Sequence, residues 1–305
     1  MANFGISEKC LCYTLTMRNR GGFTIVETLM VLAVTSIIFV AVIGSVTDRQ
    51  NRIQFSQGMR DINSNISDVL NDVTTGFFPT TPGLTCTAGS NNNPPQLGYN
   101  ASTGDTTGAR KDCVFAGKVI QIGTDTSASL GFVYSMAGRR LTANSNDVAN
   151  FAELQPVVID SKNTDNVTIS AGISNIDATG GLSLPYGIRI VRSDGSDGGR
   201  AIGVFYKDFR GVSLNGQSSS GITQVAIADV FSATSGPSSM TQTNVIAAAD
   251  NTTALSSKFL SGSSTITLCF KGDTTGQTAT ITIGDGIQGN LRLDYEVDLS
   301  GVVCD

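Results

Sequence analysis

The sequence predicts an α+β protein in which one long N-terminal helix packs on a β-rich, mostly antiparallel globular head. Three observations support this fold class. Residues 23–46 form an apolar run in which Glu27 is the only charged residue. Residues 53–73 carry apolar side chains at helical spacing, and the chain beyond Cys113 alternates short β-branched and aromatic runs with turn residues.

The apolar run is long enough to cross a membrane. A helix over residues 23–46 would be ~36 Å long, against a hydrocarbon layer of ~30 Å. Arg18 and Arg20 lie directly before the run, so the positive-inside rule keeps this flank in the cytoplasm and exports the rest. A carboxylate within the run is costly in hydrocarbon, and we therefore expect Glu27 to have a partner.

The residues around the start of the run resemble a known signal. Arg20-Gly21-Gly22 followed by Phe-Thr-Ile-Val-Glu-Thr-Leu is similar to the class III signal of type IV prepilins and type II secretion pseudopilins, in its type IVa form. The resemblance implies that a prepilin peptidase cuts between Gly22 and Phe23 and methylates the new N-terminus. It also implies an assembly role for Phe23 and for Glu27, which occupies the family's glutamate at the fifth mature position.

Charge explains what Glu27 could do there. Cleavage would leave a cationic amine on Phe23, and in a bundle of identical helices the amine of an incoming subunit could reach the carboxylate of its neighbour. Desolvation offsets much of the attraction in such a pair, so we expect it to set register rather than to add stability. The alternative is a partly exposed interfacial glutamate in an ordinary signal anchor.

The expected domains follow from the cleavage site. Residues 1–22 are the leader, 23–75 the pilin helix and 76–305 an extracellular head. The short stretch 17–22 resembles type IVa leaders better than the full segment 1–22 does. Translation could therefore start at Met17. Cys10 and Cys12 precede the cleavage site and would be lost in either case.

The cysteines of the head predict disulfides. Four remain after cleavage, and four allow three connectivities. Proximity favours Cys86 with Cys113 and Cys269 with Cys304, each closing a loop of roughly 30 residues. A zinc site is the alternative, but the chain has no Cys-x-x-Cys spacing and no histidine. We expect no metal and no cofactor.

The second half of the helix is predicted to be amphipathic and to pack against a sheet. A single helix from about residue 24 to 75 is expected, ending near Gly76 and Pro79. Gly44 could permit either local unwinding of the helix or close packing with another helix. The same two alternatives apply to Gly58. The predicted apolar face consists of Ile53, Met59, Ile62, Ile66, Val69, Leu70 and Val73.

The head is predicted to be a set of short strands after a long surface excursion. Residues 80–112 are rich in Gly, Asn, Pro and Thr and predict no regular element. A short helix is expected at Asn244–Ala249, and the last three strands should form a meander with a turn at Gly272-Asp273. The predicted strands are Val114–Ile122, Leu130–Met136, Val157–Ile159, Val167–Ile169, Gly187–Val191, Ala201–Tyr206, Gln224–Phe231, Ser264–Lys271, Thr278–Ile283 and Asn290–Val297.

Candidate chemistry in the head is sparse. Residues 194–198 (Asp-Gly-Ser-Asp-Gly) could offer oxygen ligands to calcium but lack the distal glutamate of an EF-hand, so a plain turn is preferred. Arg139-Arg140 and Arg110-Lys111 are the densest basic pairs, and they are read as solvated loop charges rather than a DNA site. The chain has 20 basic and 25 acidic residues, a balance that does not attract nucleic acid. Without histidine the usual serine or cysteine triads are excluded, and we expect no enzyme.

The sequence therefore predicts a filament subunit with three functional alternatives. The first is a major or minor pilin of a type IV pilus, which polymerises through the helix. The others are a pseudopilin of a type II secretion system and a tip pilin that binds as an adhesin or DNA receptor. The resemblance implies as partners other copies of the chain, the prepilin peptidase, and the assembly platform with its ATPase. The chain would lie in the inner membrane and then in an extracellular filament.

Overall fold

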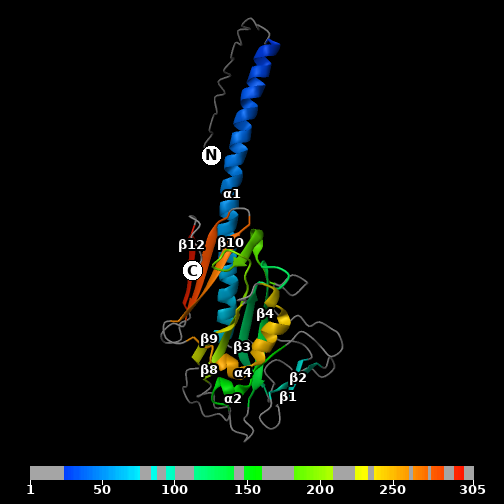
Figure 1. Ribbon diagram of the computed structural model, residues 1–305, viewed down its shortest axis with the longest axis vertical. Coiled ribbons are helices and arrows are strands. Elements are labelled where there is room, and N and C mark those ends of the chain that lie inside the picture. Colours follow the sequence, from blue (N-terminus) through cyan, green and yellow to red (C-terminus); the bar gives the residue numbers. More distant parts are fainter. Residues whose placement is uncertain are drawn as a thin grey trace, which may run out of the picture. The chain divides into compact units, whose positions relative to one another are not determined.

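The computed structural model describes residues 24–75, 84–87, 94–99, 113–140, 148–159, 182–208, 224–232, 237–260, 264–273, 276–284 and 292–298. The chain divides into two compact units with the boundary after Arg49. Helices and strands are both present (Figure 1), and every pairing among the described strands is antiparallel. The α+β fold class is confirmed.

The first element is helix α1, Ile25–Thr75. It is continuous through Gly44 and ends where the sequence predicted. The first part, through residue 44, is exposed at every position. From Phe55 onward one stripe of the helix is buried in the core of the head. The predicted change from an all-apolar to an amphipathic helix is therefore confirmed.

One predicted member of the buried stripe is wrong. Ile53 is 66% exposed, whereas Phe55 is 2% exposed and begins the stripe. Two residues correspond to about 200° of rotation at 3.6 residues per turn, so these two side chains lie on opposite sides of the helix. The other predicted positions are buried: Met59, Ile62, Ile66, Val69, Leu70 and Val73.

The described strands form three sheets. The six-stranded sheet has the order β5 (Val157–Val158), β4 (Leu130–Arg139), β3 (Cys113–Ile122), β8 (Arg200–Asp208), β9 (Gln224–Ser232), with β6 (Leu182–Ser183) also on β4. The four-stranded sheet has the order β12 (Arg292–Asp298), β11 (Thr278–Gly284), β10 (Thr265–Gly272), β7 (Ile188–Val191). The third sheet is the pair β1 (Leu84–Thr87) and β2 (Gln96–Tyr99).

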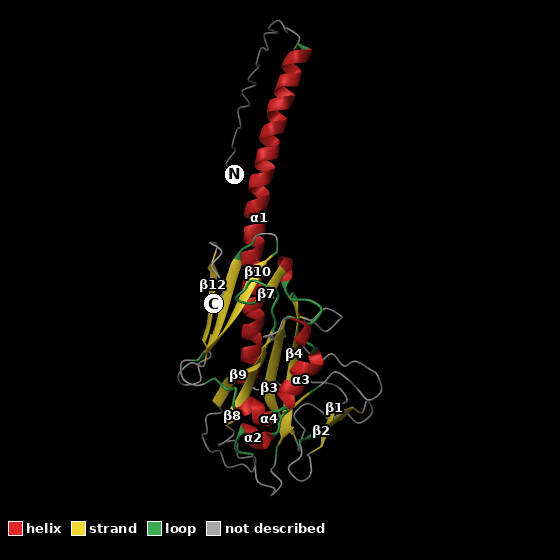
Figure 2. Cartoon of the chain, in the orientation of Figure 1, coloured by secondary structure: helices red, strands yellow, loops and turns green. Residues whose placement is uncertain are grey.

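The core of the head has two parts. The first joins the buried stripe of α1 to apolar side chains from both larger sheets, for example Ile120 of β3 and Phe270 of β10. The second covers the opposite face of the six-stranded sheet with three short helices (Figure 2): α2 (Phe151–Leu154), α3 (Gln242–Asp250) and α4 (Thr252–Ser256). The predicted packing of the amphipathic half of α1 against a sheet is therefore confirmed, and its buried stripe packs against both larger sheets.

Most predicted strands are present within a few residues of their expected bounds, and β10, β11 and β12 form the predicted meander. Helix α3 contains the predicted Asn244–Ala249. The prediction of no regular element in 80–112 is wrong, because β1 and β2 pair there. Helices α2 and α4 were not predicted. The predicted strand Val167–Ile169 lies outside the described residues.

Candidate functional site

The start of α1 places Glu27 in the first helical turn. Thr24 precedes the helix, and the Glu27 amide donates to its Oγ1 at 3.3 Å. Threonine followed three residues later by glutamate is the capping-box pattern, and a carboxylate at this end of a helix is favoured by the helix dipole. This cap was not predicted from the sequence, although the spacing Thr24-Ile-Val-Glu27 fits the capping-box pattern. Gly22 and Phe23 lie outside the described residues.

The apolar part of α1 has no cover within the described residues. Its large side chains between Ile25 and Val46 are exposed by about half or more. By length and composition this helix could cross a membrane. Exposed apolar surface of this extent requires lipid or other protein around it. Gly44 has open space beside it, so its two alternatives remain as the sequence left them.

The last turns of α1 are fixed to the six-stranded sheet by two polar contacts. Lys118 of β3 has a side chain that is 1% exposed, and its Nζ lies 2.6 Å from Oδ2 of Asp72, which is 36% exposed. The Tyr206 hydroxyl of β8 donates to the carbonyl oxygen of Val73. Buried lysines are rare without a partner, so this ion pair accounts for the lysine in the core.

A β-bulge directs Lys118 toward α1. The register of β3 against β4 shifts between Phe115 and Gly117, which reverses the inside-outside alternation of the strand beyond this point. Gly117 has φ +145°, and a Cβ there would lie 2.1 Å from the Val204 carbonyl oxygen, so only glycine fits. After the bulge, Lys118 shares the α1-facing side of β3 with Ile120.

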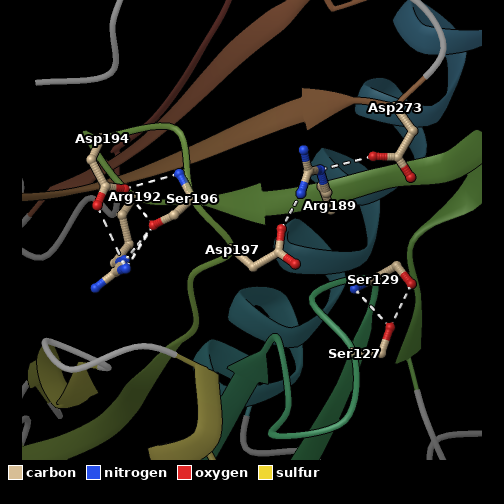
Figure 3. Close-up of polar contacts among 8 residues, drawn as sticks. All are labelled: Ser127, Ser129, Arg189, Arg192, Asp194, Ser196, Asp197 and Asp273. Carbon is tan, nitrogen blue, oxygen red and sulfur yellow. Dashed lines mark hydrogen bonds and ion pairs between the residues drawn. The ribbon is translucent and has the colours of Figure 1, made fainter.

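The candidate calcium loop is a turn closed by its own side chains (Figure 3). The Ser196 amide donates to Oδ1 of Asp194 at 2.9 Å, and the Ser196 hydroxyl donates to the same oxygen. Arg192 donates to the Ser196 hydroxyl, with its Nη2 at 2.6 Å. The hydrogen bonds from Ser196 lower the pKa of Asp194, with a smaller contribution from Arg192. The arrangement agrees with the preferred interpretation as a plain turn.

The second aspartate of this loop belongs to a different contact (Figure 3). Arg189 of β7 donates to Asp197 through Nη1, and its Nε lies 2.8 Å from Oδ1 of Asp273 in the β10–β11 turn. The guanidinium therefore joins two loops that flank β7. Within the described ranges, no group of three or more acidic, cysteine or histidine side chains could hold a metal ion.

The structure describes one of the two basic pairs, Arg139-Arg140. Arg139 is 4% exposed at the end of β4, and its Nε donates to the carbonyl oxygen of Glu153 at 2.6 Å. The interpretation of Arg139 as a solvated loop charge is therefore wrong. A buried guanidinium bonded to the backbone is also unavailable to a phosphate. Arg110 and Lys111 lie outside the described residues.

The cysteines are only partly accounted for. Cys113, the first residue of β3, is disulfide-bonded. Cys86 lies in β1, and its pairing with Cys113 stays a prediction. Cys269 is buried in β10 beside Val191. Its predicted partner Cys304 lies outside the described residues.

The fold and the start of α1 define the class of protein: an exposed apolar helix of membrane-spanning length, with a carboxylate in its first turn, that continues into an antiparallel head. Residues 17–43 match the family model described as the prokaryotic N-terminal methylation motif. The chain thus carries the signature of type IV pilins and pseudopilins. No curated protein and no solved structure matches the chain.

The motif defines the general function of the chain. It indicates a pilin-like or pseudopilin protein, processed by prepilin peptidase and assembled into a pilus or pseudopilus. The family is structural rather than enzymatic. Together with the apolar helix, the motif indicates membrane anchoring before assembly.

Proposed function

We propose that the chain is a structural subunit of a type IV pilus, cleaved between Gly22 and Phe23 and polymerised through α1. Under this proposal residues 1–22 are the leader and 76–305 form an extracellular head closed by the Cys86–Cys113 and Cys269–Cys304 disulfides. Packing with neighbouring α1 helices would replace lipid contacts along the apolar segment. The platform and its ATPase would supply the energy for extraction from the inner membrane.

The observation that carries the proposal is the position of Glu27 in the first turn of an apolar helix that nothing in the described chain covers. A neighbouring subunit would bring a Phe23 amine to this carboxylate. A slipped neighbour would leave both charges unpaired in an apolar bundle, where breaking a buried pair costs about 3–5 kcal/mol. Charge thus selects the register, while apolar packing supplies the contact.

Two substitutions at Glu27 separate its charge from its cap. Glu27→Gln removes the charge but keeps a residue that can complete the capping box, whereas Glu27→Ala removes both. We expect both variants to insert into the membrane normally and to be depleted from sheared filaments. Filaments with normal incorporation of Glu27→Gln would contradict the register argument and leave only the cap.

Two measurements test the function itself. Mass spectrometry of the mature chain should give a methylated N-terminus at Phe23, and sheared surface filaments should contain the chain. Abundance in those filaments distinguishes a major from a minor pilin. A chain absent from surface filaments, but required for secretion of folded exoproteins, would instead be a pseudopilin.

A further inference from the structure

A cleft of about 480 Å³ lies among three segments of the head that are far apart in the sequence. Ala152 of α2 and Gln155, which directly follows this helix, line one part of it. Pro94 ahead of β2 lines a second part, and residues within 250–256, the end of α3 and the whole of α4, line the third. Ligand sites typically enclose about 300–1,000 Å³, so the cleft has the size of a small-molecule site.

Gln155 lines this cleft in an unfavourable state. It has φ 47° and ψ 60°, the left-handed region that few residues other than glycine and asparagine occupy. Its Oε1 is buried and has no hydrogen-bond partner within the described residues. Strained backbone and unpaired buried polar atoms both destabilise a fold, and both concentrate at functional sites. Rotation of the amide would bring this oxygen to a donor in the cleft, so a ligand hydroxyl can supply the missing bond.

The side of the cleft opposite Gln155 in the sequence order is held in place by hydrogen bonds to the backbone. Oδ1 of Asp250 accepts from the Val158 amide at 2.7 Å, and Oδ1 of Asn251 accepts from the Ala254 amide at 3.1 Å. These bonds fix both side chains but use only one atom of each. The NH2 group of Asn251 and the exposed hydroxyl of Thr253 have no partner in the described part of the chain. Both groups are therefore available to a ligand.

The charge and polarity of the lining select the class of ligand. Among the described lining residues Asp250 is the one charged group, and none is a lysine or arginine. A phosphate, a sulfate or a nucleic acid would therefore meet a negative charge without a compensating cation. An apolar ligand would leave amides and hydroxyls unpaired. Amides and hydroxyls both donate and accept, and so do the hydroxyl groups of a neutral sugar.

We propose that this cleft binds a neutral saccharide. The Gln155 amide, the Asn251 NH2 group and the Thr253 hydroxyl bond the ring hydroxyls, and the Asp250 carboxylate accepts from a further one. The backbone bonds of Asp250 and Asn251 place these groups before the sugar arrives, which lowers the entropy lost on binding. The cleft uses no residue of α1, so the inference does not depend on polymerisation. It gives the head a binding role in addition to a structural one.

A glycan array tests the ligand class. The full-length chain, purified in a detergent without a sugar headgroup, should be retained on neutral glycans. Retention on sulfated or sialylated glycans alone, or on no glycan, would overturn the inference.

Substitutions in the cleft test the site. Thr253→Val removes a hydroxyl from the second residue of α4, and Thr243→Val makes the same change at the exposed second residue of α3, outside the cleft. Gln155→Gly removes the amide and also relieves the strained backbone. We expect Thr253→Val and Gln155→Gly each to weaken binding about fivefold or more, the effect of one lost hydrogen bond, and Thr243→Val to leave it unchanged.

Two measurements separate binding from stability. Calorimetric titration with the neutral glycan that gives the strongest array signal measures the affinity, and thermal unfolding measures Tm. Gln155→Gly should keep or raise Tm while binding weakens, an outcome that a purely structural role of Gln155 does not give. Wild-type affinity in both Thr253→Val and Gln155→Gly would place the sugar elsewhere and overturn the assignment of this cleft.

Discussion

The ion pair between Lys118 and Asp72 should show an asymmetry when either partner is removed. Asp72→Ala removes an acceptor 2.6 Å from an ammonium group that is 1% exposed. Breaking a buried pair costs about 3–5 kcal/mol when the remaining charge stays buried. Asp72 is itself 36% exposed, so water can reach this end of the pair, and we expect a loss at the lower end, about 3 kcal/mol.

The opposite substitution should cost much less. Lys118→Met keeps an unbranched apolar side chain in the core, and it leaves behind a carboxylate that solvent already contacts. We expect a loss of about 1 kcal/mol or less, because replacing a buried ion by an apolar side chain is often neutral. The double variant should resemble Lys118→Met, since the buried cation is then absent.

Thermal unfolding of the full-length chain in detergent, followed by circular dichroism, measures the difference. For a head of this size a loss of 3 kcal/mol corresponds to a fall in Tm of about 6–12 °C, and a loss of 1 kcal/mol to about 2–4 °C. Asp125→Asn, which changes an exposed carboxylate in the turn between β3 and β4, serves as a control for general loss of charge. Equal falls for Asp72→Ala and Lys118→Met would refute the reasoning that the buried ammonium carries the cost.

Two further predictions concern single hydrogen bonds. Tyr206→Phe removes the donor to the Val73 carbonyl and should lower the free energy of unfolding by about 1 kcal/mol in urea titration; an unchanged value would show that water replaces the hydroxyl. Ser196→Ala should raise the pKa of Asp194 toward its ordinary 3.8, because Ser196 supplies the largest causes of its lowering. Because the pKa of Asp194 in the folded protein lies below 3.8, the ionised carboxylate stabilises the fold at neutral pH. This contribution is lost as the pH falls from 3.8 through the pKa of the folded state. Carboxyl NMR titration of both proteins measures the shift, and identical titration curves would contradict it.

The disulfide assignment has its own check. Non-reducing peptide mapping should recover Cys86 joined to Cys113, and Cys113→Ser should destabilise the head by about 3 kcal/mol for a loop of this length. A peptide that joins Cys113 to Cys269 or Cys304 would show that proximity in the sequence misled the assignment.

The sequence predicted what periodicity and local spacing determine. The continuous helix and its change of character near the end of the apolar run followed from the apolar period. Most of the strands followed from β-branched and aromatic runs between turn residues, although β1, β2 and β6 were not predicted. Ile53 was assigned to the buried face wrongly because it lies at the start of the amphipathic half of the helix. A single apolar residue there does not define which face is buried. Phe55 was the better candidate, since it lies four residues before Met59 and seven before Ile62.

Tertiary contacts were beyond the reach of the sequence. From the sequence, Lys118 looks like an ordinary surface lysine in a strand. Its side chain points into the core because of the bulge at Gly117, which the local sequence does not predict. Arg139 was assigned to a loop because it begins a basic pair, yet β4 extends to it and the structure buries it. Strands β1 and β2 were missed because their Gly-, Asn- and Pro-rich surroundings resemble a loop.

The position of α1 between two sheets has a consequence for folding order. The stripe from Phe55 to Val73 is synthesised early, but its cover includes Ile281 and Ile283 of β11, more than two hundred residues later in the chain. Contacts of such sequence separation close slowly, because loop-closure entropy is lost before they form. Under the proposed export, the amphipathic part of α1 must therefore wait uncovered, or be sheltered by a chaperone, until almost the whole head has crossed the membrane.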